Sequence, residues 1–382
     1  MKKSGVLLGI ASLFATMVWL YLGEEAPPTP VSPVSRPQTG SAYGLAFDPV
    51  LEGSKPYSPA ARGNEGETAA RGGGKPSAAF DSVEARQRHF DRLVEQPADS
   101  LWSYWQQLLN DHQVTQLEMA TYALAHKLRQ AGNEEIYSSI AEVLREPSLS
   151  TGQKRWVVDL LTETATSEAL KVVLNEAVNS QPSALQRLLL ESVLKMTNNR
   201  WDARFHPELS PVLEEIWNQR PGDWELLVTV ATGIANAGSE RGGALLLRAV
   251  ANSGPTVTKV EKGKNLPALA ALRALRKIRN PEVVPILAKE LTHADLEDVV
   301  FIASGDALAA MGRPEATEAL LEWAKQAPRE ATPLVERWFR QIRDSVSLER
   351  LHKDLLQNKP FRSEQIKEKL AVTLKEIEPV VE

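Results

Sequence analysis

Histidine is the first residue type to test for chemistry, because paired histidines hold catalytic zinc. None of the six histidines has the His-Glu-x-x-His spacing by which one helix presents two ligands to a metal ion. They are His89, His112, His126, His206, His293 and His352. Only His206 shares a polar segment with an acid and a base, Asp202 and Arg204, and a capping or surface role explains it more simply. The sequence predicts no metal site.

The sequence also lacks the motifs of a catalytic nucleophile and of a phosphate-binding loop. The chain has no cysteine and therefore no thiolate nucleophile or disulfide, and no serine stands in a Gly-x-Ser-x-Gly turn. Residues 71–75, RGGGK, end in Gly-Lys. However, Ala69 and Pro76 occupy the positions where a phosphate-binding loop needs a glycine and a Ser or Thr. We expect no enzyme activity and no cofactor.

The strongest charge signal is a basic stretch in an otherwise acidic chain. The formal net charge of −5 argues against a nucleic-acid-binding protein. Between positions 259 and 279 the only carboxylate is Glu261, against seven cations: Lys259, Lys262, Lys264, Arg273, Arg276, Lys277 and Arg279. The spacing of Arg273, Arg276 and Lys277 puts them on one helical face. A solvated helix face is the simpler interpretation, and the sharper one is a docking patch for an acidic protein, glycan or lipid headgroup.

Tryptophan supplies the second binding signal, because this residue is over-represented where partners bind most strongly. Of the nine tryptophans, those at apolar helical positions, such as Trp156 and Trp323, are expected in the core. Trp201 and Trp224 lie beside turn signals and are better candidates for a partner surface. The predicted partner-binding residues are therefore Arg273, Arg276, Lys277, Trp201 and Trp224.

The elements that position these residues are expected to be helices. From about residue 80 onward, apolar residues recur at i, i+3, i+4 and i+7, with almost no alternating run. Breaks every 12–20 residues suggest stacked hairpins. About seven hairpins are expected, over residues 121–144, 156–178, 185–219, 234–250, 271–291, 304–324 and 335–356.

The clearest internal repeat aligns residues 271–291 with 304–324 at an offset of 33. The identical pairs are Ala274/Ala307, Leu275/Leu308, Pro281/Pro314, Glu282/Glu315 and Leu287/Leu320. Each copy is interpreted as a helix end, a tight turn and a proline at the first position of the next helix. Asn280 is a good N-cap and Arg313 a poor one. Leu275 and Leu308 are expected to be buried between hairpins.

A weaker copy at 234–250 aligns Gly238 with Gly312 and Leu246 with Leu320.

This spacing of Ala, Leu and the turn proline resembles the HEAT-repeat family, including the short bacterial repeats of phycobilin-lyase relatives, over roughly residues 115–350. The resemblance implies a right-handed α-solenoid that serves as a binding scaffold, usually without catalysis. Residues 197–206, the basic loop 259–264 and the first 35 residues of the helical body depart from the pattern. Burial of apolar surface also favours such a stack, because a single hairpin cannot bury its apolar face whereas stacked hairpins can.

The N-terminal sequence predicts that the rest of the chain is exported across a membrane. Residues 4–23 form an uncharged apolar run of 20 residues, enough to cross a hydrocarbon core of about 30 Å as a helix. Lys2 and Lys3 precede it, so the positive-inside bias keeps the first residues in the cytoplasm. We expect a retained single-pass anchor in a bacterial inner membrane with a periplasmic body. A cleaved signal is the alternative.

Three regions are therefore expected: an anchor at 1–23, a Pro/Gly-rich flexible linker at 24–79 and an all-α, HEAT-like solenoid at 80–382. The leading hypothesis for function is a non-catalytic, membrane-anchored periplasmic scaffold that binds another protein. One alternative is a membrane-tethered folding or secretion chaperone, because lipase-specific foldases share this order of parts. The foldase motif Arg-x-x-Phe-Asp-Tyr fails here, since Gln87 and Arg92 stand where Arg and Tyr are expected. A lyase or hydrolase is less favoured.

Overall fold

The computed structural model describes residues 83–180, 183–198, 204–219, 222–253, 265–292, 295–343, 345–356 and 360–377. These residues form seventeen α-helices and three short 3-10 helices, and they contain no strand. The prediction of an all-α fold is confirmed for the described part of the chain.

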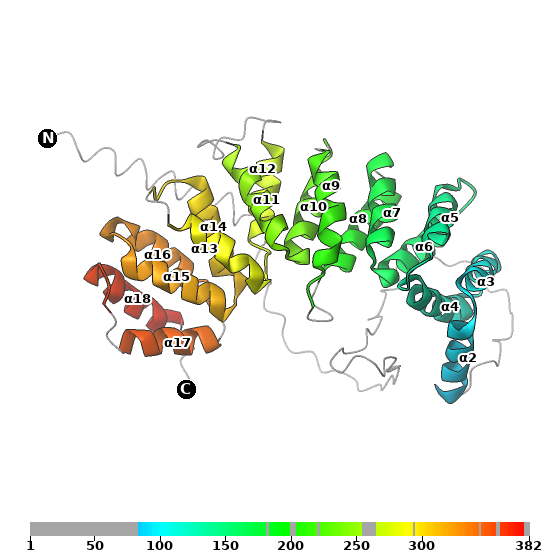
Figure 1. Cartoon of the computed structure of the whole chain (residues 1–382), viewed down its shortest axis with the longest axis horizontal. Coiled ribbons are helices and arrows are strands. Elements are labelled where there is room, and N and C mark those ends of the chain that lie inside the picture. Colours follow the sequence, from blue (N-terminus) through cyan, green and yellow to red (C-terminus); the bar gives the residue numbers. More distant parts are fainter. Residues whose placement is uncertain are drawn as a thin grey trace, which may run out of the picture.

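The helices form two layers that follow an arc from α2 to α18 (Figure 1). Each even-numbered helix packs on the next even-numbered one, so this layer is continuous. The even layer comprises α2 (Val83–Glu95), α4 (Val114–Leu128), α6 (Thr151–Thr164), α8 (Ala184–Thr197), α10 (Trp224–Ala237), α12 (Leu266–Leu275), α14 (Val299–Met311), α16 (Thr332–Phe339) and α18 (Glu364–Ile377).

The odd layer comprises α3 (Ala98–Asn110), α5 (Glu134–Arg145), α7 (Ser167–Asn179), α9 (Ser210–Asn218), α11 (Glu240–Ala251), α13 (Val284–Glu290), α15 (Pro314–Gln326) and α17 (Ser345–Leu356). The 3-10 helices η1 (Pro207–Leu209), η2 (Pro281–Val283) and η3 (Arg329–Ala331) lead into α9, α13 and α16. Between α5 and α17, neighbours in this layer pack closely except α9 and α11.

The seven expected hairpins correspond to the seven helix pairs from α4/α5 to α16/α17. Local signals explain where helices begin and end. Ser150 forms a capping box with Gln153 at the start of α6. Gly238 and Gly312 end α10 and α14 with φ of 68° and 64°, a left-handed conformation that glycine adopts without steric cost. The two glycines that the repeat alignment pairs therefore have the same structural role, which is to end a helix.

Residues that are aligned in the two predicted repeats occupy equivalent positions in the structure, with one difference at the helix cap. Pro281 and Pro314 each stand at the first position of the following helix. Asn280 caps η2 by accepting a hydrogen bond from the Glu282 N–H at 3.1 Å, whereas Arg313 makes no side-chain cap.

The repeats share one buried apolar core that runs from Leu93 to Leu374. Leu275 and Leu308 are 0% and 1% exposed, as expected. A stack of short hairpins thus gains the continuous core that none of them has alone.

The predicted anchor and linker lie outside the described residues. None of the helices that the structure describes is long and apolar enough to cross a membrane.

Candidate binding surface

Helix α10, helix α12 and the turn after α12 carry the described members of the predicted partner-binding set. Asp223 caps α10 by accepting hydrogen bonds from the N–H groups of Glu225 and Leu226, which puts Trp224 at the first helical position. Pro267 stands in the first turn of α12. The two helices pack closely along the even layer, so one face of α10 lies next to one face of α12.

Arg273 stacks on Trp224. The guanidinium carbon lies 5.3 Å from the centre of the indole ring, within the range of a cation–π contact. Trp224 is half-buried and packs against the core, while Arg273 is exposed. The ring therefore gives the guanidinium a fixed platform. A cation–π contact does not use up the guanidinium N–H groups, so they can still bind a planar acceptor such as a carboxylate.

Arg273, Arg276 and Lys277 were expected on one helical face, but only Arg273 lies within a helix. Helix α12 ends at Leu275, so Arg276 is its C-cap and Lys277 lies in the turn that follows. The Lys277 ammonium donates to the Thr232 hydroxyl of α10 at 3.4 Å. Arg276 is half-buried and Lys277 is exposed. The surface formed by Trp224, Thr232, Arg273, Arg276 and Lys277 is called the α10–α12 surface below.

The α10–α12 surface differs in charge from the C-terminal part of the same layer. There, cations on α16 and α18 pair with carboxylates: Arg337 with Asp306, Arg340 with Glu336 and Glu376, and Lys369 with Glu336. By contrast, neither Arg273 nor Arg276 forms an ion pair with any carboxylate in the described ranges. An acidic ligand therefore meets positive charge at the end of α12 that no described carboxylate neutralises.

Several predicted residues take no part in this surface or cannot be placed on it. Trp201 and the lysines at 259, 262 and 264 lie outside the described residues. Trp156 and Trp323 pack against the core but are half-buried, so they are less enclosed than expected.

Other chemistry-bearing residues stay dispersed in the described part of the chain. His206 Nδ1 lies 3.0 Å from Glu208 Oε1, a local contact at the start of η1. No group of three or more His, Asp or Glu side chains there is arranged to hold a metal ion. Two shifted pKa values lie far from α12 in sequence and have structural causes. Burial raises the pKa of Glu163 above its usual value, and burial raises the pKa of Tyr137 to about 12.

Sequence reasoning missed Thr232, which is buried at 5% exposure and accepts the hydrogen bond from Lys277. No local signal marks it, because a threonine inside an apolar helix usually bonds to its own backbone. The sequence alone also gave no indication that the side chains of Arg273 and Trp224 are in contact. The contact arises from the packing of two helices that a third helix, α11, separates in sequence.

Residues 268–293 match the family model described as PBS lyase HEAT-like repeat. This segment covers α12 from Ala268, η2 and α13, which is nearly all of one two-layer unit, and it includes Arg273, Arg276 and Lys277. The expected resemblance to HEAT-like repeats is confirmed over that unit. No curated protein is similar enough to the chain to count as a relative.

Proposed function

We propose that this protein is a non-catalytic helical scaffold that captures an acidic segment of another protein on the α10–α12 surface. The observation that carries the proposal is the stacking of Arg273 on Trp224 beside Arg276, with no described carboxylate pairing either arginine. Aromatic residues and arginines dominate the binding energy of protein interfaces. A two-layer solenoid suits this role because its stacked helices offer an extended surface.

The test compares two triple charge reversals in the full-length chain. In cells, chemical crosslinking followed by mass spectrometry identifies the partner of the unmodified protein. Changing Arg273, Arg276 and Lys277 to Glu is expected to abolish recovery of that partner. The melting temperature is measured as well, because the three changes also remove the Arg273–Trp224 contact and the Lys277–Thr232 hydrogen bond. Loss of the partner supports the proposal only if the variant still unfolds cooperatively above the temperature of the binding experiment.

A matched control has the same change in net charge at other sites. Lys171, Lys289 and Arg313 are exposed residues of the odd layer and of the turn before α15. Changing these three to Glu should leave recovery of the partner unchanged. If both triple variants lose the partner equally, net charge rather than the α10–α12 surface governs capture, and the proposal fails.

A single conservative change sharpens the test. Arg273→Lys keeps the positive charge but loses the planar guanidinium that stacks on Trp224 and can bind a carboxylate with two hydrogen bonds. We expect this variant to bind the partner at least tenfold more weakly. Equal binding by the lysine variant means that only charge matters at position 273.

We also propose that residues 4–23 anchor the protein in a bacterial inner membrane with its helical body in the periplasm. The support is the uncharged apolar run preceded by Lys2 and Lys3. A reporter that is active only after export should be active when fused after Gly23, and a cytoplasmic reporter should be inactive there. The reverse result contradicts export, and a mature N-terminus near Ala26 replaces the anchor with a cleaved signal.

A further inference from the structure

Gln186 is a buried amide on α8, the even-layer helix that packs against α10 (Figure 1). Its residue is only 4% exposed. The side-chain nitrogen Nε2 donates to Asp223 Oδ2 at 2.7 Å and to the backbone carbonyl of Ala177 in α7 at 3.4 Å. An ionised carboxylate only accepts hydrogen bonds, so the nitrogen of the glutamine amide, and not its oxygen, faces Asp223. This amide therefore connects α8 to the residue that begins α10.

Asp223 receives this hydrogen bond while it also caps α10. Its Oδ1 accepts from the backbone N–H groups of Glu225 and Leu226 at 2.8 and 3.4 Å. Those two bonds use one carboxylate oxygen, and Gln186 holds the other. A hydrogen bond to an ionised carboxylate is about twice as strong as one between neutral groups. Gln186 therefore restricts rotation of the capping side chain and holds the first turn of α10 against α8.

Asp298 shows the same kind of cap without a glutamine beside it. Its Oδ1 accepts from two backbone N–H groups at the start of α14, at 2.8 and 2.9 Å. Within the described ranges, no side chain donates a hydrogen bond to Asp298. The residue after this cap is Val299, whereas the residue after Asp223 is Trp224. The additional bond thus occurs at the cap whose next residue belongs to the α10–α12 surface.

The cap matters for stacking because Trp224 is the first residue of α10. The N–H groups of a first helical turn have no partner inside the helix, so this turn depends on its cap for its position. The Arg273 guanidinium carbon lies 5.3 Å from the centre of the Trp224 ring. A shift of the first turn that carries the ring away from α12 would break this cation–π contact.

The same hydrogen bonds also keep a carboxylate away from Arg273. Asp223 directly precedes Trp224, and both of its carboxylate oxygens accept hydrogen bonds from groups other than Arg273. Asp223 and Arg273 form no ion pair with each other in the described structure. A carboxylate released at this point would compete with an acidic ligand for the Arg273 guanidinium.

We propose that Gln186 is a positioning residue of the α10–α12 surface: through Asp223 it holds the first turn of α10 where Trp224 can stack on Arg273. This inference rests on the proposed function, because it concerns the same surface. Gln186 is buried and carries no charge, so it acts on a partner only through Asp223 and Trp224. Loss of the Gln186–Asp223 hydrogen bond should displace the indole and weaken capture of an acidic partner, although every cation of the surface remains.

The experiment observes Trp224 directly, by fluorine NMR of the full-length chain labelled with fluorotryptophan in a non-ionic detergent. The resonance that is absent from Trp224→Phe belongs to Trp224. Arg273→Gln then shows where this resonance lies without the stacked guanidinium. Trp102 of α3 and Trp323 of α15, assigned in the same way, lie in distant repeats and report whether each variant is folded.

An exchange of donor and acceptor isolates the hydrogen bond. Gln186→Glu places two carboxylates opposite each other without a donor, and should move the Trp224 resonance toward its position in Arg273→Gln. Asp223→Asn keeps a residue that caps helices equally well. It should change little, because the glutamine amide can turn and accept from the asparagine. The double variant, Gln186→Glu with Asp223→Asn, restores the bond with its donor and acceptor exchanged, and should bring the resonance back.

Two further variants separate the hydrogen bond from general damage to α8. Gln186→Met removes the amide, adds no charge and nearly conserves the volume of the side chain, so it should also move the Trp224 resonance. Ser183→Ala is the matched control. It removes the cap of α8, which accepts from the Gln186 backbone N–H at 3.2 Å, but it leaves the glutamine side chain in place. This variant should leave the resonance unchanged.

Recovery of the crosslinked partner is the second measurement. It should fall severalfold in Gln186→Glu and return in the double variant. The proposal is overturned if neither Gln186→Glu nor Gln186→Met moves the Trp224 resonance, if the double variant does not restore it, or if Ser183→Ala moves it equally. It is also overturned if the triple charge reversal loses the partner while Gln186→Glu keeps it.

Failure of the proposed function gives a different result. In that case the triple charge reversal of the α10–α12 surface keeps the partner. The fluorine spectra do not depend on any partner, so they still decide whether Gln186 positions Trp224.

Discussion

Gly305 of α14 is in contact with the indole ring of Trp338 of α16: a Cβ built on this glycine would lie 2.0 Å from Trp338 Cζ2. The ring has little freedom to move away. Trp338 is fully buried, it packs on Phe301 and Trp323, and its Nε1 donates to Asp306 Oδ1 at 2.9 Å. Glycine at 305 is therefore what allows α14 and α16 to approach each other.

Gly305→Ala should destabilise the protein by at least about 1–3 kcal/mol, the usual cost of overpacking a filled core. Urea unfolding followed by far-UV circular dichroism measures the loss. The control is Gly152→Ala in α6, where the nearest atom to an added Cβ is Ser150 Oγ at 3.9 Å. That variant should be no less stable than the unmodified protein, because Ala is a better helix former than Gly. Equal stability of both variants contradicts the close packing at Trp338.

Leu275→Ala and Leu308→Ala should each cost about 2–5 kcal/mol, since each removes a fully buried side chain and leaves a cavity. The similar cost follows from their equivalent positions in the repeat alignment, in the C-terminal parts of α12 and α14. Val114→Ala is the comparison, because Val114 is 57% exposed and should change stability by less than about 0.5 kcal/mol. A loss below 1 kcal/mol at either leucine would argue against burial between the two layers.

Asn280→Ala should be more costly than loss of an ordinary cap. The Asn280 side chain accepts from the Glu282 N–H and also donates to the Gly238 carbonyl of the preceding repeat at 2.7 Å. Removing it loses the cap and leaves a buried carbonyl unsatisfied, about 1–3 kcal/mol by denaturant unfolding. Arg313→Ala, at the equivalent position without a cap, should be nearly neutral. The prediction is wrong if the two alanine variants have the same stability.

Glu163→Gln should stabilise the protein at neutral pH. Burial raises the pKa of Glu163 above 4.5; Asp159 adds to the rise, while Arg129 and Lys195 oppose it. The folded state therefore binds this proton more tightly than the unfolded state, and stability falls as pH rises from 4.5 through the raised pKa. Glutamine stays neutral and avoids that loss.

The check for Glu163→Gln is the difference in free energy of unfolding between the variant and the unmodified protein, measured from pH 4 to pH 8. The difference should favour glutamine at neutral pH and shrink toward pH 4. A glutamine variant that is less stable at pH 7 would show that the favourable charges of Lys195 and Arg129 outweigh burial of the carboxylate.

The helical class, the seven central hairpins and the repeat joints could be predicted from the sequence because they depend on local signals. The boundaries were less exact: the hairpin expected at 234–250 begins inside α10, which starts at Trp224. The 3.6-residue periodicity marks a helix, and Pro281, Pro314 and Asn280 mark helix starts through fixed backbone geometry and capping. Burial of Leu275 and Leu308 follows from the same periodicity. The basic character of residues 259–279, which include α12, also needed no tertiary information.

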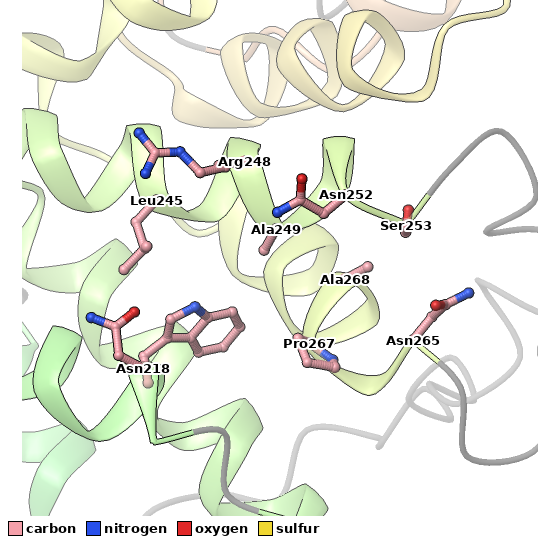
Figure 2. A pocket seen from close by; sticks show the side chains of 10 residues that line it. Asn218, Leu245, Arg248, Ala249, Asn252, Ser253, Asn265, Pro267 and Ala268 are labelled. Atoms are coloured by element: carbon pink, nitrogen blue, oxygen red, sulfur yellow. The ribbon is translucent and has the colours of Figure 1, made fainter.

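What only the tertiary structure decided is which residues from different helices meet. Arg273 reaches Trp224, and Lys277 reaches Thr232, because α10 and α12 pack at one particular register. The pocket that Trp217 of α9, Arg248 of α11 and Ala268 of α12 line (Figure 2) likewise depends on how these three helices pack. The spacing of residues along one helix fixes which side chains share a face, but it does not fix the offset or distance between two helices. That offset depends on how all the buried side chains of both layers pack together.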